Sequence, residues 1–173
     1  MVIPVSRFKN RLIAKLLARF PFLAKRSVAA YQPPELGEIP WTQVTKKLNE
    51  SIIALVTTAG VHHRAQKPFD MEDHNGDPSF RVIDVTKAFT DLIITHDYYD
   101  HADADKDINI VFPVDRLKEF KQEGLIGKVA DTHYGFMGHI TGSHLPTLIN
   151  KTAPEVARLL KKAGVDIVLL TPG

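Results

Sequence analysis

The sequence predicts an α/β protein: a mostly parallel sheet with flanking helices in a Rossmann-like three-layer arrangement, preceded by a basic helical arm. From residue 41 onward, short β-branched segments alternate with helix-like segments, as parallel strands joined by crossover helices require. Residues 1–30 carry seven basic side chains and no acidic one. We therefore expect a basic amphipathic arm and proline-rich connector over residues 1–40, and an α/β domain over residues 41–173.

Each element of the domain has its own signal. "SIIALVTTAG" and "VDIVLL" are continuous apolar runs typical of buried strands, and we expect them to be parallel neighbours or near-neighbours. "FRVIDV" and "DLIITHD" are two further short strands. "PVDRLKEFKQEG" predicts a helix that ends at Gly124. "TAPEVARLLKKAG" predicts a helix with Thr152 as its cap, Pro154 in its first turn and Gly164 at its end.

The arm contains "RLIAKLLARFPFLAKR", a basic amphipathic helix interrupted at Pro21, which lacks a backbone donor. We expect its apolar stripe to be buried against the domain or a partner subunit; the stripe comprises Phe8, Leu12, Leu16 and Phe20. Weak contact of residues 1–30 with an anionic membrane surface is the alternative. The other 143 residues carry 15 basic and 20 acidic groups, and we expect no nucleic-acid partner.

Composition sets further bounds. With 173 residues and 44% apolar content, the chain is long enough for one domain with a substantial core. No apolar run approaches the roughly 20 residues that cross a bilayer. Cysteine is absent, which excludes disulfides, thiolate metal ligands and a cysteine nucleophile within these residues. This absence fits a reducing compartment, and we expect a cytoplasmic protein.

The segment "ITHDYYDHADADKDINIVFP" gathers five aspartates between Asp97 and Asp107, together with two histidines. It follows a strand, and ligands of parallel sheets gather beyond the carboxyl ends of strands. A calcium loop fails because Ile108 and Val114 occupy its glycine and glutamate positions. A solvated, helix-capping aspartate run and a mononuclear metal site remain open; the candidate metal ligands are His96, Asp100 and His101.

Histidines mark other strand ends. His62 and His63 follow "TTAG", which lacks the glycines and lysine of a phosphate loop. His62 is a candidate acid or base, as is His101 in the acidic segment. Zinc ligands recruited from His62 or His133 are not excluded by spacing.

Several long motifs resemble the selenoprotein B family, which contains the selenoprotein subunits of glycine, sarcosine and betaine reductases and of D-proline reductase. The motifs are "ALVTTAGVH", "GDPSFR", "ITHDYYDHADADKDINIVFPVDRL", "GLIGKVADTHYGFMG" and "AGVDIVLLTPG". They occur in the family's order from about Trp41 to Gly173, and the resemblance does not extend to the basic arm.

The resemblance implies reductive cleavage of a carbon–nitrogen bond. A pyruvoyl group on a partner subunit activates the amine or amino-acid substrate, and a selenolate or cysteine thiolate attacks the α-carbon. A thiol or thioredoxin-type reductant then restores the nucleophile. That nucleophile lies in a short redox motif after a strand similar to "VDIVLL". We therefore expect a chain truncated just before this motif, with the selenocysteine or cysteine beyond Gly173 and no activity in residues 1–173 alone.

The resemblance also gives the acidic segment a role. Asp97, Asp103, Asp105 and His133 are expected to bind a cationic amine, because ammonium groups form charge-assisted hydrogen bonds with carboxylates. Two other functions stay open: a non-catalytic binding or scaffold protein of the same fold, and a mononuclear metal-dependent hydrolase.

Overall fold

This computed structural model describes residues 5–29, 42–86 and 91–173. The predicted proline-rich connector and Trp41 lie outside the described residues. The chain divides into two compact units, one of Met1–Thr45 with Asp97–Asp100 and one of Lys46–His96 with His101–Gly173. The domain boundary at residue 41 stays a prediction.

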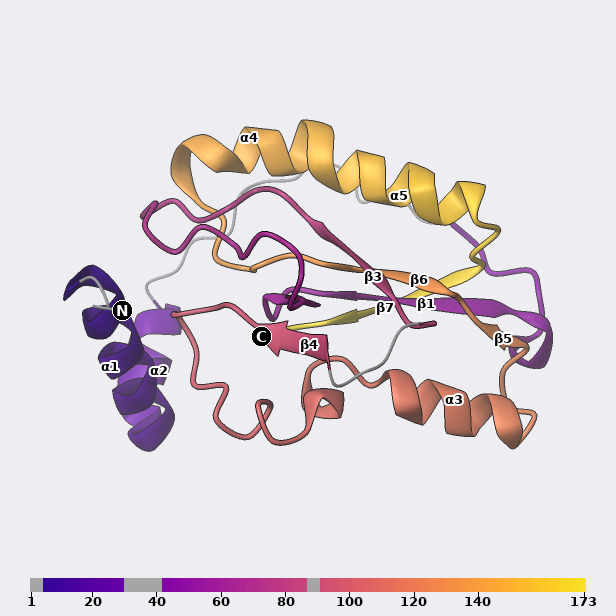
Figure 1. Ribbon diagram of the computed structural model, residues 1–173, viewed down its shortest axis with the longest axis horizontal. Coiled ribbons are helices and arrows are strands. Elements are labelled where there is room, and N and C mark those ends of the chain that lie inside the picture. Colours follow the sequence, from indigo (N-terminus) through magenta and orange to yellow (C-terminus); the bar gives the residue numbers. More distant parts are fainter. Residues whose placement is uncertain (1–4, 30–41, 87–90) are drawn as a thin grey trace. The chain divides into compact units, whose positions relative to one another are not determined.

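A sheet of five strands is built around β1 (Ile52–Thr57), the predicted buried strand (Figure 1). Along one edge β1 pairs in parallel with β7 (Ile167–Thr171) over five residues. Its other edge pairs in parallel first with β5 (Lys128–Val129) and then with β6 (Thr132–Gly135). The predicted parallel pairing of the two apolar runs is confirmed. The predicted burial of the second run is wrong: β7 lies at the edge of the sheet, and Val168, Leu169 and Leu170 are all exposed.

Two pairings make the structure mixed rather than parallel throughout. β3 (Arg81–Asp84) runs antiparallel to β6. β2 (Val61–His63) and β4 (Leu92–Ile94) form a separate antiparallel pair. β1 and β2 are joined by a sharp turn at Gly60, without a crossover helix between them. β2 therefore does not extend the parallel sheet and pairs with β4 instead.

Helices lie on both sides of this sheet in Figure 1: α3 (Val114–Gln122) on one side and α5 (Ala153–Lys162) on the other. Gly124 and Gly164 follow the two helices with φ of 73° and 71°, as the sequence predicts. Each helix buries two apolar residues: Val114 and Leu117 in α3, Val156 and Leu160 in α5.

Short helical turns complete the domain. They are η1 (Leu48–Glu50), η3 (Ile108–Ile110), η4 (Gly142–His144), α4 (Leu145–Thr147) and the π-helical η5 (Leu148–Thr152). The predicted cap at Thr152 is wrong, because Thr152 already has helical dihedrals and its side chain makes no capping bond. Pro154 has no N–H to donate, and the π-turn lies directly before it.

The first unit contains α1 (Val5–Arg19) and α2 (Pro21–Ala29), so the predicted interruption at Pro21 is confirmed. Phe8, Leu12, Leu16 and Phe20 are all exposed in the isolated chain, and the burial of this stripe against the domain or a partner subunit stays a prediction. Two arginines of α1 turn toward a buried aspartate, as described below. Among the described residues, no helix combines the length and apolarity needed to cross a membrane.

Candidate functional site

The carboxyl ends of β1 and β7 lie side by side and are held by threonine hydroxyls. Thr57 and Thr171 end these strands, and their hydroxyls donate to the carbonyl oxygen of Val111 over 2.9 and 2.7 Å. The amide of Thr58 donates to the carbonyl of Thr171 over 2.9 Å. We call these strand ends, Thr57, Thr58 and Thr171, the strand-end platform. Thr57 is buried, whereas Thr58 is exposed, so the platform reaches solvent.

Two glycines allow loops to approach this platform. Gly60 and Gly138 have φ of 74° and 82°, a conformation that favours glycine. A Cβ on Gly138 would lie 2.5 Å from the carbonyl oxygen of Thr58 and 3.4 Å from Nε2 of His96. A Cβ on Gly60 would lie 2.4 Å from the carbonyl oxygen of Thr95. Three segments of the sequence, "TTAG", "ITH" and "FMG", therefore meet at the end of β1.

His62 is a buried, neutral member of this region. Its Nδ1 lies 2.8 Å from the carbonyl oxygen of His63, which can only accept, so the proton is on Nδ1. Its Nε2 therefore accepts from the hydroxyl of Thr95, 2.8 Å away. Burial lowers the pKa of His62; the hydrogen bond to the His63 carbonyl partly opposes this effect, and the charge of Arg81 lowers the pKa further. The residue has the protonation state of a base at neutral pH.

The acidic segment is largely occupied by its own contacts. In the first unit, Asp97 is fully buried and accepts from Nε of Arg7 at 2.5 Å and from Nε of Arg11 at 2.6 Å. Burial alone would raise the pKa of Asp97, but these guanidinium groups outweigh it and hold the pKa below its usual value. Asp97 is therefore an ionised carboxylate whose partners are arginines of α1.

In the second unit, Asp105 accepts from Nδ1 of His101 at 2.8 Å, and Asp103 accepts from Nζ of Lys106 at 2.7 Å. Both carboxylates stay substantially exposed. Asp107 caps η3 by accepting from the amide of Asn109. This cap agrees with the solvated, helix-capping interpretation of part of the run.

Residues 5–29, 42–86 and 91–173 contain no ligand set for the metal-dependent alternative. No three histidine, aspartate or glutamate side chains in this part of the chain come together as a metal site requires. His96, one of the three predicted ligands, is buried beside Gly138.

His133 lies inside the sheet rather than on a binding surface. Between β5 and β6 the pairing with β1 slips by two residues, from Ile53 opposite Val129 to Val56 opposite Tyr134. In this gap Nδ1 of His133 accepts the amide of Leu55 over 2.8 Å. The imidazole is fully buried, and burial lowers its pKa from 6.5 to about 4.

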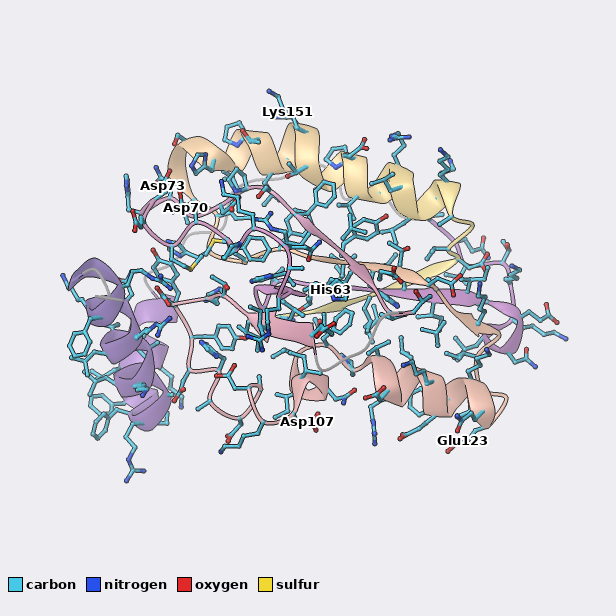
Figure 2. All side chains as sticks on the ribbon, viewed as in Figure 1. His63, Asp70, Asp73, Asp107, Glu123 and Lys151 are labelled. Atoms are coloured by element: carbon cyan, nitrogen blue, oxygen red, sulfur yellow. The ribbon has the colours of Figure 1, made fainter. Side chains whose placement is uncertain are left out.

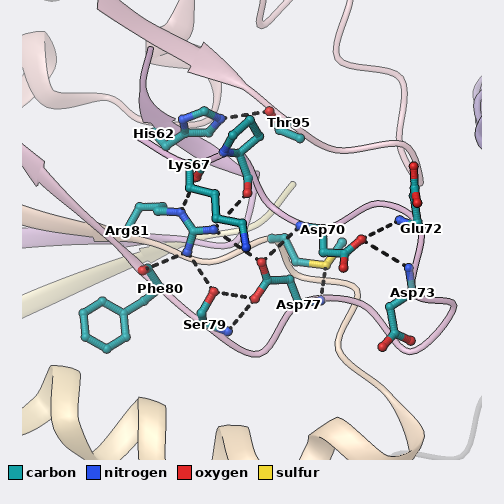
Figure 3. A network of polar contacts seen from close by, with 12 residues as sticks. His62, Lys67, Asp70, Glu72, Asp73, Asp77, Ser79, Phe80, Arg81 and Thr95 are labelled. Carbon is teal, nitrogen blue, oxygen red and sulfur yellow. Dashed lines mark hydrogen bonds and ion pairs between the residues drawn. The ribbon is translucent and has the colours of Figure 1, made fainter. Parts of the chain in front are cut away.

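Sequence reasoning gave no functional role to the loop between β2 and β3. Asp77 accepts from the amides of Ser79 and Asp70 and from Arg81, and all five N–H donors of Arg81 are used in this loop (Figure 3). Arg81 also lies 4.3 Å from the ring centroid of Phe69. The motif "GDPSFR" was the available signal, and the structure shows that its Asp77–Arg81 pair fixes the loop.

Asp70 and Asp73 lie together at the tip of the same loop (Figure 2). Asp73 accepts from Nε2 of His144 at 2.8 Å, which connects the loop to η4. The loop, which includes Lys67, lines a surface pocket of about 600 Å³ together with Arg81 and His144. The charged side chains of this lining are of both signs.

The sequence relationships decide the family. The family model for glycine/sarcosine/betaine reductase selenoprotein B matches residues 7–173. The chain belongs to this family. The match includes most of the basic arm, which corrects the expectation that the arm lies outside the resemblance.

Curated members of the selenoprotein B family are subunits of reductase complexes. D-proline reductase subunit gamma of Acetoanaerobium sticklandii is 45% identical over 133 residues, which cover 77% of this chain and 53% of the relative. Betaine reductase complex component B subunit beta of Peptoclostridium acidaminophilum is 34% identical over 145 residues, covering 80% and 31%. Glycine reductase complex component B subunit gamma of Carboxydothermus hydrogenoformans is 32% identical over 141 residues, covering 80% and 32%.

The chain thus spans between about a third and about half of the length of these relatives. No solved structure matches the chain. The Rossmann-like three-layer arrangement predicted for this selenoprotein B chain therefore stays a prediction.

Proposed function

We propose that the chain is part of a subunit of an amino-acid reductase complex of the D-proline reductase type, which cleaves a carbon–nitrogen bond reductively. The observation that carries this proposal is the 45% identity to a D-proline reductase subunit, against 26–34% to the glycine, sarcosine and betaine reductase components. Family membership supports the reductase class, and the difference in identity supports D-proline within it.

The proposed reaction breaks the bond between the α-carbon and the ring nitrogen of D-proline. Two electrons and two protons are added, one proton to the nitrogen and one to the carbon, which gives a linear amino acid. A dithiol supplies the electrons and becomes a disulfide. A selenolate or thiolate supplies the nucleophile for the α-carbon, and a pyruvoyl group on a partner subunit activates the amine.

The described residues suit a supporting role in this chemistry. The sequence has no cysteine, so the nucleophile must come from outside these 173 residues. The geometry at the end of β7 supports a position of the nucleophile close to this strand end. The carbonyl of Thr171 accepts from the amide of exposed Thr58, so the end of β7 lies beside the exposed end of β1. Gly60 and Gly138 bring the neighbouring loops close to the same platform.

We assign proton handling at this platform to the His62–Thr95 pair. His62 is neutral, and the Nδ1–H bond to the His63 carbonyl fixes its tautomer. Its Nε2 can therefore receive a proton through the hydroxyl of Thr95, which is half-buried at the end of β4. His101 is a second candidate acid or base, held by Asp105.

Binding of the cationic amine falls to Asp103 and Asp105, because their carboxylates are exposed although they pair with Lys106 and His101, whereas Asp97 is fully buried against two guanidinium groups. His133 was predicted to join them, but its complete burial favours a structural role. The required partners are the pyruvoyl-bearing subunit and a thiol or thioredoxin-type reductant.

The test is a substrate comparison on the native complex. A tag on this chain would isolate the complex from its source cells, and dithiothreitol oxidation would be measured with D-proline, glycine, sarcosine and betaine in turn. We expect D-proline to support the fastest oxidation, with one disulfide formed per linear amino acid. Oxidation with none of the four would overturn the reductase proposal, and faster oxidation with another substrate would overturn the assignment to D-proline.

A further inference from the structure

The two faces of helix α1 differ in chemistry. Arg7 and Arg11, one turn apart, both bond the buried carboxylate of Asp97 within the first unit. Ala14, which lies on the same face one turn further along, is 5% exposed. The face of α1 that meets Asp97 therefore carries two arginines and a buried alanine, and the large apolar side chains lie on other faces of the helix.

The opposite face of α1 is apolar and exposed. Phe8, Leu12 and Leu16 recur at four-residue spacing, which places them on one stripe, and they are 61%, 49% and 43% exposed. Exposed apolar side chains continue beside this stripe and into α2: Ile13, Phe20, Phe22 and Leu23. An apolar stripe of this size is unusual on a protein surface that meets only water.

The charge of the same segment is of one sign. Residues 5–29 contain seven basic side chains and no acidic one. Asp97 neutralises part of the charge at Arg7 and Arg11, whereas Lys9, Lys15 and Arg19 are exposed on the outward half of α1. Lys9 and Lys15 thus flank the apolar stripe, whereas Arg19, three residues after Leu16, lies in line with it at the end of α1. Cations beside an apolar stripe are typical of helices that lie in a membrane interface.

We propose that residues 5–29 dock on an anionic lipid surface, with the apolar stripe of α1 and α2 inserted among the acyl chains and the flanking lysines and arginines on the headgroups. Charge complementarity selects this occupant over a second copy of the chain, because two copies would bring equally basic segments together. Nucleic acid would satisfy the cations but leave the stripe in water.

Asp97 is the positioning residue of this anchor. By holding Arg7 and Arg11, it fixes the rotation of α1 about its own axis, so that Phe8, Leu12 and Leu16 stay on the outward side. The association requires no new fold, since the helix and its exposed stripe already exist. The proposed lipid binding does not involve the strand-end platform of the second unit.

The test is co-sedimentation of the full chain with lipid vesicles. Vesicles of phosphatidylcholine with about one-third phosphatidylglycerol should bind at least about tenfold more protein than pure phosphatidylcholine vesicles at low salt, and added salt should reduce the difference. The double substitution Leu12→Asp/Leu16→Asp should reduce binding at least about tenfold. The matched control is Ile110→Asp/Leu125→Asp, which alters two apolar residues that are also about half exposed.

Three results would overturn the proposal. One is equal binding to neutral and anionic vesicles, and another is equal loss of binding in the stripe variant and its control. The third is a vesicle-free dimer that dissociates on Leu12→Asp/Leu16→Asp, because the stripe would then be an interface between copies. Far-ultraviolet circular dichroism of each variant shows whether the helices are retained. None of these readouts uses reductase activity, so the proposed function stands or falls separately.

Discussion

The burial of His133 makes a prediction about stability that separates a structural histidine from a substrate-binding one. Its Nδ1 accepts the amide of Leu55, so the neutral ring carries its proton on Nε2, which has no hydrogen-bond partner among the described residues. Burial lowers the pKa of His133 from 6.5 to about 4, although the Ala130 carbonyl and the Asp131 carboxylate partly oppose the shift. The ring packs edge-on against Phe112, with centroids 5.5 Å apart.

The direction in which the free energy of unfolding changes with pH follows from proton linkage. Between pH 6.5 and 4 the unfolded chain binds a proton at this histidine and the folded chain does not. Stability from this group is therefore complete above the unfolded pKa and falls as the pH is lowered through that window. A shift of this size corresponds to at most about 3 kcal/mol of unfolding free energy.

Two substitutions separate the contributions. His133→Leu removes the acceptor and leaves the buried amide of Leu55 unpaired, which costs about 1–3 kcal/mol at pH 7. His133→Asn keeps an acceptor within reach, and we expect it to be about 1 kcal/mol more stable than His133→Leu. Both variants should lose much of the pH dependence between pH 6.5 and 4.5, and the remaining slope should belong to His62 and the carboxylates.

The assay is urea denaturation followed by circular dichroism, with the unfolding free energy extrapolated at several pH values across this window. If His133→Asn retains the pH slope of the unmodified chain, His133 is accessible to protons in the folded state and our reasoning is wrong. Equal instability of the two variants at pH 7 would refute the role of the Leu55 hydrogen bond.

Two further predictions concern the arm and the strand ends. Asp97→Asn should lower the hydrogen-exchange protection of α1 because it weakens the pairing with two guanidinium groups, whereas Asp103→Asn should not; unchanged protection in both would contradict the pairing. Gly138→Ala should destabilise the chain by at least about 1 kcal/mol more than Gly124→Ala, since both glycines have positive φ but only Gly138 faces a backbone oxygen; equal loss in urea melts would show that the loop yields.

Local patterns predicted the elements well because their causes are local. The apolar run of β1, the stop at Gly124 and the break at Pro21 each depend on a few neighbouring residues, and each is found where expected. The parallel pairing of β1 with β7 was predicted from the two apolar runs and is found, but only β1 is buried, whereas β7 is mostly exposed.

The errors arise where distant residues decide the outcome. Asp97 pairs with arginines about ninety positions earlier, a contact that the sequence patterns did not predict and that determines which face of α1 meets Asp97. The antiparallel pairing of β2 with β4 and the two-residue slip filled by His133 likewise depend on register, which no local pattern encodes.

The placement of the active site at the ends of β1 and β7 is the central claim, and one activity ratio tests it most directly. The tagged complex would carry Thr58→Trp, which fills the exposed strand-end platform, or Leu125→Trp, another exposed position, close to β5. We predict that D-proline-dependent dithiol oxidation falls at least about tenfold with Thr58→Trp and stays within about twofold with Leu125→Trp. Equal rates in the two complexes, both correctly assembled, would place the reaction away from these strand ends.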